Sequence, residues 1–282
     1  MIELGPNAYG KSAIRIVTVD RSTTPHRIRD LTVDVRLEGD FDAAHTAGDN
    51  AAVIATDTMK NTAYAFAAER REAPVEALAI ALAEHFVEPA QVASARVDVR
   101  EHAWRPVTTS GGRAASAFVR SDAGTRIARA TAARDAPTAV EAGIEDLVVM
   151  RTAGSSFSGF ARDRYTTLAE TSDRILATSV TARWRYDPPP DDPDATWSAI
   201  LDTWLEAFAE HDSPSVQATI WVVGRAILER HSEVAEIDMR LPNLHHWSVD
   251  LGPVGLPEAT GVFVATREPY GLIEATVRRS DA

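Results

Sequence analysis

The stretch LTVDVRLEGD (Leu31–Asp40) has the pattern of a β-strand. Its apolar residues alternate with polar ones, which is the period-2 pattern of a β-strand with one buried face. The preceding stretch SAIRIVTVD (Ser12–Asp20) is also strand-like, and the polar residues RSTTPHR (21–27) that join the two suit a turn. The sequence therefore predicts a β-hairpin near the N-terminal end.

The stretch VIATDTMKNTAYAF (Val53–Phe66) changes character within a few residues. Val53–Ala55 suits the end of a buried strand, and the alanine-rich residues after Asn61 suit a helix. Backbone N–H groups are unpaired at the start of a helix, so the polar residues between these segments could simply be caps. They could also belong to a functional site, and both interpretations stay open at this point.

The remainder of the chain repeats one order of elements. A helix over residues 74–89 precedes strands over 93–101, 116–121 and 125–132. A second series has strands over 144–153 and 175–186, helices over 193–212 and 213–231, and strands over 235–241, 245–251, 261–266 and 272–279. We expect Ser213 to cap the last helix, with Pro214 at its first position. The repeat predicts an α+β protein of two domains, 1–138 and 139–282, with the boundary in AARDAPTAVEAG (132–143).

Composition narrows the class of protein. The 282 residues are 45% hydrophobic, which is ample for a core, and 29 basic against 41 acidic residues give a net charge of -12. This acidic balance, without a long basic run, argues against nucleic acid as a partner. The absence of cysteine excludes disulfides, thiol nucleophiles and iron–sulfur ligation. Neither a secretory leader nor a membrane-span window is evident, so we expect a soluble, cytoplasmic protein with no membrane partner.

General motifs of catalysis and cofactor binding are missing. The sequence has no Walker loop, no GxGxxG after a strand, no HExxH and no GxSxG. His245 and His246 are adjacent on a predicted strand, which would send their side chains to opposite faces and make them a poor metal pair. We expect no metal site.

Four stretches together carry a family resemblance: AYGKSAIR (8–15), ATDTMKNT (55–62), FSGFARDRYTTLAETSDRILAT (157–178) and LPNLHHWSVDL (241–251). With them the chain resembles the urate oxidases, the cofactor-free uricases, and the likeness extends to PYGLIEATVRR (269–279). The resemblance implies two tandem tunnelling-fold (T-fold) domains, each an antiparallel sheet with a pair of helices. It also implies a homotetramer around a β-barrel-like tunnel, with active sites shared between subunits.

The resemblance assigns roles to individual residues. It places a catalytic proton relay at Lys11, Thr56 and His245. It places contacts to the substrate, urate, at Thr56, Asp57, Phe157, Arg174, Val216, Gln217 and Asn243. Arg174 and Gln217 would clamp urate, the Phe157 ring would stack on it, and Asn243 would lie on the side that receives O2.

Residue chemistry supports these roles to different extents. The planar fork of Arg174 suits one edge of a purine anion, although without the resemblance an arginine there would be expected to pair with Asp173 or Glu170. Gln217 in the first turn of a helix can both donate and accept, but it could be an ordinary surface residue. Phe157 is surrounded by small residues, so its ring could cover a flat ligand or plug the core.

The mechanism implied by the resemblance needs no cofactor. A threonine hydroxyl is a poor base unless neighbours take its proton, which a lysine and a histidine could do. The electrons for O2 would come from the urate dianion, giving 5-hydroxyisourate and hydrogen peroxide. Two alternatives stay open: a non-catalytic purine- or pterin-binding T-fold protein, which would not need Lys11, Thr56 and His245, and a pterin-acting T-fold enzyme, which would carry an acidic anchor in place of Gln217. The presence of all three relay residues favours the oxidase.

Overall fold

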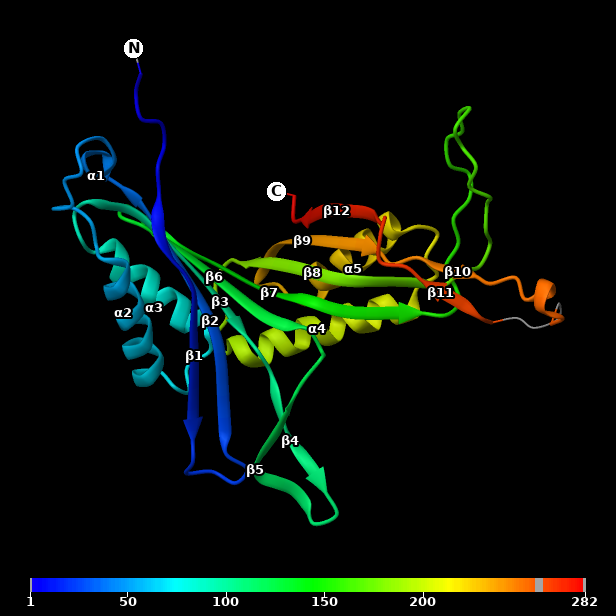
Figure 1. Ribbon diagram of the computed structural model, residues 1–282, viewed down its shortest axis with the longest axis horizontal. Helices are drawn as coiled ribbons and strands as arrows, with labels where there is room; N and C mark the ends of the chain where they lie inside the picture. The colour runs from blue at the N-terminus through cyan, green and yellow to red at the C-terminus, as the bar shows by residue number, and fades with distance from the viewer. Residues whose placement is uncertain (1, 257–260, 281–282) are drawn as a thin grey trace. The chain divides into compact units, whose positions relative to one another are not determined.

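The computed structural model describes residues 2–256 and 261–280 (Figure 1). Its chain forms two compact units. Unit 1 comprises Met1–Ile144 with Pro188–Asp194, and unit 2 comprises Glu145–Asp187 with Ala195–Ala282. The segment 132–143, where the sequence places a domain boundary, forms the end of one strand, a short turn and the start of the next strand. The division into domains at residue 138 stays a prediction.

Unit 1 is an antiparallel sheet with helices on one face. Its strands lie in the order β1-β2-β3-β6-β7, and a separate two-stranded ribbon is formed by β4 and β5. The strands are β1 (Tyr9–Asp20), β2 (Arg27–Gly39), β3 (Val92–Glu101), β4 (Trp104–Thr109), β5 (Gly112–Arg120), β6 (Thr125–Ala133) and β7 (Ala136–Arg151), which continues into unit 2. The helices are α1 (Asp42–Thr46), α2 (Thr56–Glu69) and α3 (Val75–Val87).

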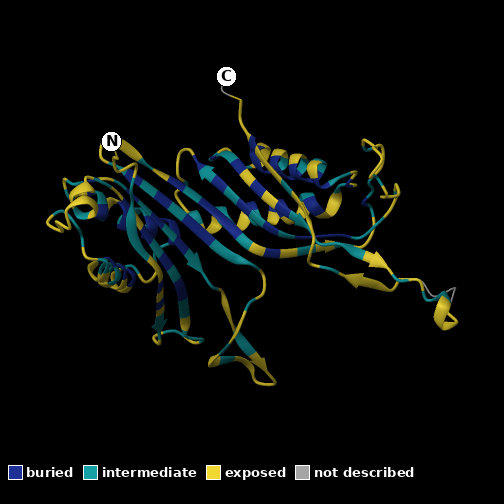
Figure 2. Cartoon of the chain, turned by 45° about the horizontal axis from the view of Figure 1, so that its top comes forward, coloured by how far each residue is buried: buried dark blue, intermediate teal, exposed yellow. Residues whose placement is uncertain are grey.

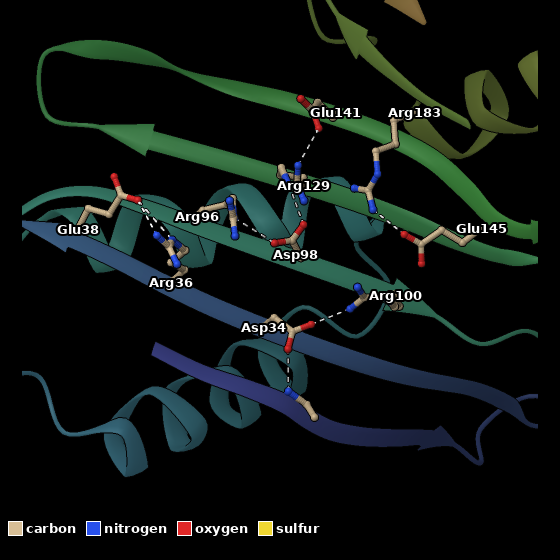
Figure 3. A network of polar contacts seen from close by, with 11 residues as sticks. Asp34, Arg36, Glu38, Arg96, Asp98, Arg100, Arg129, Glu141, Glu145 and Arg183 are labelled. Atoms are coloured by element: carbon tan, nitrogen blue, oxygen red, sulfur yellow. Dashed lines mark hydrogen bonds and ion pairs between the residues drawn. The ribbon is translucent and has the colours of Figure 1, made fainter. Parts of the chain in front are cut away.

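The two faces of the unit 1 sheet differ in chemistry. Leu31, Val33, Val35 and Leu37 are all buried, which confirms the alternation predicted for β2 (Figure 2). Helices α2 and α3 pack on the sheet, α2 against β1 and α3 against β3 and β6 (Figure 1). The polar positions of the strands carry ion pairs, including Arg100 with Asp34 at 2.6 Å (Figure 3). The apolar face therefore makes the core, and the charged face keeps its groups paired.

Unit 2 repeats the arrangement of unit 1, an antiparallel sheet with helices packed on it. Its strands lie in the order β7-β8-β9-β12, and β10 and β11 form a separate two-stranded ribbon. The elements are β8 (Leu176–Tyr186), α4 (Pro193–Glu210), α5 (Val216–Arg230), β9 (Val234–Asn243), β10 (His246–Ser248), the 3-10 turn η1 (Gly252–Val254), β11 (Phe263–Ala265) and β12 (Gly271–Arg278). Helix α5 packs against β9 and β12. Among the described residues, no helix combines the length and apolar character needed to cross a membrane.

Two local predictions were wrong. Val53–Ala55 is not a strand: the Val53 N–H donates to the Asn50 carbonyl at 3.0 Å, and the Tyr9 hydroxyl accepts from the Ile54 N–H at 2.8 Å. Helix α5 starts at Val216, with Ser215 as its N-cap instead of Ser213. The sequence pattern also does not predict β4, whose residues show no alternation of burial.

Candidate active site

The YGK motif positions the first group of candidate residues in unit 1. Gly10 faces β2 so closely that a Cβ atom would lie 1.8 Å from the carbonyl oxygen of Val35, so no other residue fits there. The hydroxyl of Tyr9 holds Ile54, which lies two residues before Thr56. Lys11 follows on the same strand, and α2, which begins at Thr56, packs against that strand. The motif therefore ties the start of α2 to the strand that carries Lys11.

A β-bulge follows Lys11. The register of β1 against β2 shifts between Lys11 and Ile14, and Ala13 adopts a φ of 56°. The carboxylate of Asp34 accepts from the Ala13 N–H at 2.7 Å and pairs with Arg100 on the next strand (Figure 3). This charge-assisted bond stabilises a backbone conformation that alanine rarely adopts. The bulge therefore interrupts the regular pairing of β1 with β2 directly after Lys11.

Thr56 and Asp57 lie in the first turn of α2. The N-cap residue, Ala55, has no side chain that could accept a hydrogen bond, so the first N–H groups of the helix have no side-chain cap. A hydrogen bond from Lys60 holds the pKa of Asp57 below its ordinary value, and the charge of Lys11 acts in the same direction. Thr56 and Asp57 thus lie at the positive end of α2, which packs against the strand that carries Lys11.

Phe157 and Arg174 lie side by side in unit 2. Phe157 exchanges backbone hydrogen bonds with Thr171 at 2.9 and 3.0 Å, and the Arg174 N–H donates to the Ser155 carbonyl at 2.8 Å. These bonds place the Arg174 guanidinium carbon 5.2 Å from the centre of the Phe157 ring. The two residues, 17 positions apart in the numbering, thus form one wall made of a cation and a flat ring.

Among the residues that the structure describes, Asp173 and Glu170 bond to groups other than Arg174. The Asp173 carboxylate accepts from the Gly154 N–H at 2.8 Å, and Glu170 pairs with Arg162 at 3.6 Å. The Nε atom of Arg174 is buried and has no hydrogen-bond partner among the described residues. Burial holds the pKa of Arg174 below its ordinary value. A buried donor without an acceptor costs stability, so this guanidinium is suited to an acceptor from outside the chain.

His245 follows the end of strand β9. Burial, and to a smaller extent the Arg174 charge, hold the pKa of His245 below its ordinary value. Its ring stacks on Trp247 with 5.1 Å between ring centres. His245 precedes β10, which begins only at His246, so the strand predicted over residues 245–251 is shorter than expected. A neutral imidazole at this position can accept a proton.

Asn243 ends strand β9 just before His245. It is in register with Thr178 on β8 and Gly271 on β12, so strands on both sides hold its backbone. The Leu244 N–H donates to the Ala177 carbonyl at 2.8 Å, which continues the link to β8. His246 turns back to its own chain, where its Nδ1 atom lies 2.9 Å from the Leu244 carbonyl. Within residues 2–256 and 261–280, no three metal-ligating side chains of His, Asp or Glu gather at one place.

Val216 and Gln217 are the first two residues of α5. The hydroxyl of Ser215 accepts from the Ala218 N–H at 3.2 Å and caps the helix. Val216 is buried, whereas Gln217 is exposed and its amide is available to a ligand. The prediction that Gln217 occupies the first helical turn is confirmed.

The candidate residues fall into two sets. Lys11, Thr56 and Asp57 belong to unit 1, and the other six belong to unit 2. A cavity of about 1010 Å³ in unit 1, with Arg27, Arg70 and Trp104 in its wall, is lined by none of them. Sequence reasoning did not single out Tyr9, because its hydrogen bond joins it to Ile54, 45 positions away in the chain.

Comparison with known proteins identifies the family. The family model named Uricase matches residues 7–131 and 140–274. The chain belongs to the uricase family. A curated uricase of Arthrobacter globiformis is 46% identical over 279 residues, which cover 99% of this chain and 90% of the relative. A uricase of Dictyostelium discoideum is 35% identical, with 99% of both chains covered.

Solved uricase structures share the fold. The crystal structure of the uricase from Arthrobacter globiformis superimposes with a TM-score of 0.92 at 46% identity, covering 100% of this chain and 96% of that chain. A uricase from Bacillus fastidious gives a TM-score of 0.81 at 27% identity, with 96% and 93% covered. The predicted α+β architecture of two repeated T-fold units is therefore confirmed at the level of the fold.

Proposed function

We propose that this chain oxidises urate with O2 and water to 5-hydroxyisourate and hydrogen peroxide, and that it needs no cofactor. Two electrons pass from urate to O2, which takes up two protons, and water supplies the new hydroxyl group. Membership of the uricase family supports this reaction. The protein's part is then to deprotonate urate, to hold it flat and to place O2 and water beside its ring.

The wall of Arg174 and Phe157 carries the proposal. A urate anion is flat, negatively charged and rich in acceptors along its edges. The guanidinium of Arg174 has a buried Nε without an acceptor among the described residues, and the ring of Phe157 lies 5.2 Å from the guanidinium carbon. In the proposed complex, urate stacks on the ring and accepts from the fork of Arg174. Gln217, exposed at the start of α5, closes the clamp beside Val216.

The relay is assigned to Lys11, Thr56 and His245. The Thr56 hydroxyl stands at the positive end of α2, where a developing negative charge is stabilised. His245 has a lowered pKa, so its neutral ring can take a proton from the substrate side. Lys11, on the strand against which α2 packs, completes the first set, and in the proposed complex Asp57 contacts urate beside Thr56. Asn243, two residues before His245, provides an amide on the side where O2 and water react.

We further propose a homotetramer in which each site is shared between subunits. One set of residues lies in unit 1 and the other in unit 2, so two chains could each contribute one set. The ribbon of β10 and β11 supports assembly, because Trp247, Phe263 and Val264 on it are each more than 40% exposed. A two-stranded ribbon with exposed apolar side chains is stabilised when a second copy of the chain covers it.

Urate turnover in air tests the proposal directly. The protein is dialysed against a strong chelator and then mixed with urate, while urate absorbance, O2 uptake and peroxide are followed together. We expect one O2 consumed and one peroxide formed for each urate lost, at the rate seen before dialysis. A rate that falls on dialysis and returns with a metal ion would contradict the cofactor-free reaction. Urate binding without O2 uptake would favour a non-catalytic purine-binding protein.

A further inference from the structure

A chain of buried hydroxyl groups lies at the start of α5, next to Val216 and Gln217. Ser213 and Thr219 are each only 1% exposed, and their hydroxyl oxygens are 2.8 Å apart. Nε2 of His211 lies 3.1 Å from the Thr219 oxygen, and the Ser213 hydroxyl lies 3.1 Å from the Ser215 carbonyl oxygen. None of these three side chains contributes to the proposed reaction. Buried hydroxyl groups that make mutual hydrogen bonds fix the geometry of the segments that carry them.

These side chains make several mutual hydrogen bonds. Each hydroxyl has a single proton to donate, and the Ser215 carbonyl can only accept. The Ser213 hydroxyl donates to the Ser215 carbonyl, and the Thr219 hydroxyl lies 2.8 Å from that of Ser213, 3.1 Å from His211 Nε2 and 3.3 Å from the same carbonyl. Burial holds the pKa of His211 below its ordinary value, which favours the neutral ring. Each of the three side chains thus has a partner, and a buried network of this kind favours one geometry.

Ser213 also connects two separate parts of the site. Its N–H donates to the Gly154 carbonyl at 2.9 Å, and its carbonyl accepts from the Ser156 N–H at 2.8 Å. Ser156 directly precedes Phe157. The hydroxyl chain ends at Ser215, the N-cap residue of α5, which directly precedes Val216 and Gln217. A few buried hydrogen bonds thus join the segment that carries the stacking ring to the helix end that carries the amide.

We propose that Ser213 and Thr219, with His211 behind them, are positioning residues that set the spacing between the Phe157 ring and Gln217. This inference rests on the proposed function, in which both groups hold urate. A flat ligand held by a ring on one segment and by an amide on another is sensitive to their separation. The hydroxyl chain fixes that separation before urate arrives, so urate binding does not have to order the two segments.

Anaerobic urate binding separates this role from catalysis. Without O2 urate is not consumed, so its dissociation constant is measured for the parent protein and for Thr219→Val and Ser213→Ala. Thr203→Val is a matched control, because Thr203 is also buried and bonds a histidine, His231, at 2.9 Å, but at the other end of α5. Thr219→Ser keeps the hydroxyl group and tests for rescue. Thermal midpoints of all variants report the purely structural cost.

We expect Thr219→Val and Ser213→Ala to weaken urate binding about ten-fold, while Thr203→Val and Thr219→Ser stay near the parent value. Equal binding by Thr219→Val and Thr203→Val would overturn the inference. If Thr219→Val does not fold, Ser213→Ala decides by the same criterion. A parent protein that binds urate without oxidising it in air would overturn the proposed reaction and leave this comparison valid. A parent that does not bind urate would overturn both.

Discussion

Replacing Tyr9 by phenylalanine tests how the start of α2 is held. The Tyr9 hydroxyl accepts from the Ile54 N–H at 2.8 Å, and its ring packs edge-on against Phe41 with 4.7 Å between ring centres. Phenylalanine keeps the packing and removes only the acceptor. A half-buried N–H left without a partner costs about 1 kcal/mol, at the low end of the range because Ile54 is not fully buried.

The same loss should reach the chemistry, because Ile54 lies two residues before Thr56. If restoring the position of Thr56 adds about 1 kcal/mol to the activation free energy, kcat/KM for urate falls about five-fold. The fall should appear mainly in kcat, because Arg174 and Phe157 belong to unit 2 and are untouched. Anaerobic urate binding should weaken by less than the fall in kcat/KM, because most of the proposed urate contacts belong to unit 2.

Three measurements decide the outcome for Tyr9→Phe. Steady-state kinetics give kcat and KM, anaerobic titration gives urate affinity, and a thermal melt should show a midpoint lower by about 2–4 °C. Tyr165→Phe is the control, because Tyr165 is 71% exposed and its removal should change neither rate nor midpoint. If Tyr9→Phe melts lower but turns over urate at the parent rate, Tyr9 supports only the fold and the reasoning is refuted.

The other predictions concern the clamp, the subunits and pH. Arg174→Lys should weaken anaerobic urate binding by about 2 kcal/mol, because an ammonium cannot replace the planar fork; an unaltered dissociation constant would remove Arg174 from the clamp. Mixing Thr56→Ala with Arg174→Ala under conditions of subunit exchange should restore activity, since some sites then carry neither lesion; confirmed exchange without recovery would show that sites are not shared. Burial and the Arg174 charge disfavour the protonated form of His245, so its base form persists as pH falls, and the acidic limb of kcat/KM should lie below its ordinary pKa of 6.5. A limb at or above that value would contradict the role of His245 as the base.

The sequence predicts elements well where the pattern is local. The alternation from Leu31 to Leu37 and the spacing of apolar residues in α4 arise from the geometry of one strand or one helix, and both elements are confirmed. Val53–Ala55 has strand-like residues, but its Ile54 N–H donates to the hydroxyl of Tyr9, which is distant in the chain. Local pattern carries no information about such contacts, so the strand prediction fails there.

In the candidate site, too, the sequence predicts what depends on local pattern and misses what depends on contacts between distant residues. Residue chemistry left Arg174 open between a structural ion pair and a ligand contact, because a sequence does not show which donors Asp173 and Glu170 engage. The structure assigns those carboxylates to Gly154 and Arg162. The hydroxyl chain of Ser213 and Thr219 was invisible for a related reason: serine and threonine are common, and only burial and mutual distance distinguish them.

The bare first turn of α2 has a consequence for stability engineering. Ala55 occupies the N-cap position with φ -57° and ψ 133°, a backbone conformation that serine or aspartate would also adopt. Such a replacement is an obvious choice for raising the melting temperature, since a new cap is worth about 1 kcal/mol. The added oxygen would, however, accept from the N–H groups of the first turn, beside the Thr56 and Asp57 side chains of the proposed site. A substitution at position 55 that raises the melting temperature is therefore expected to lower the turnover rate.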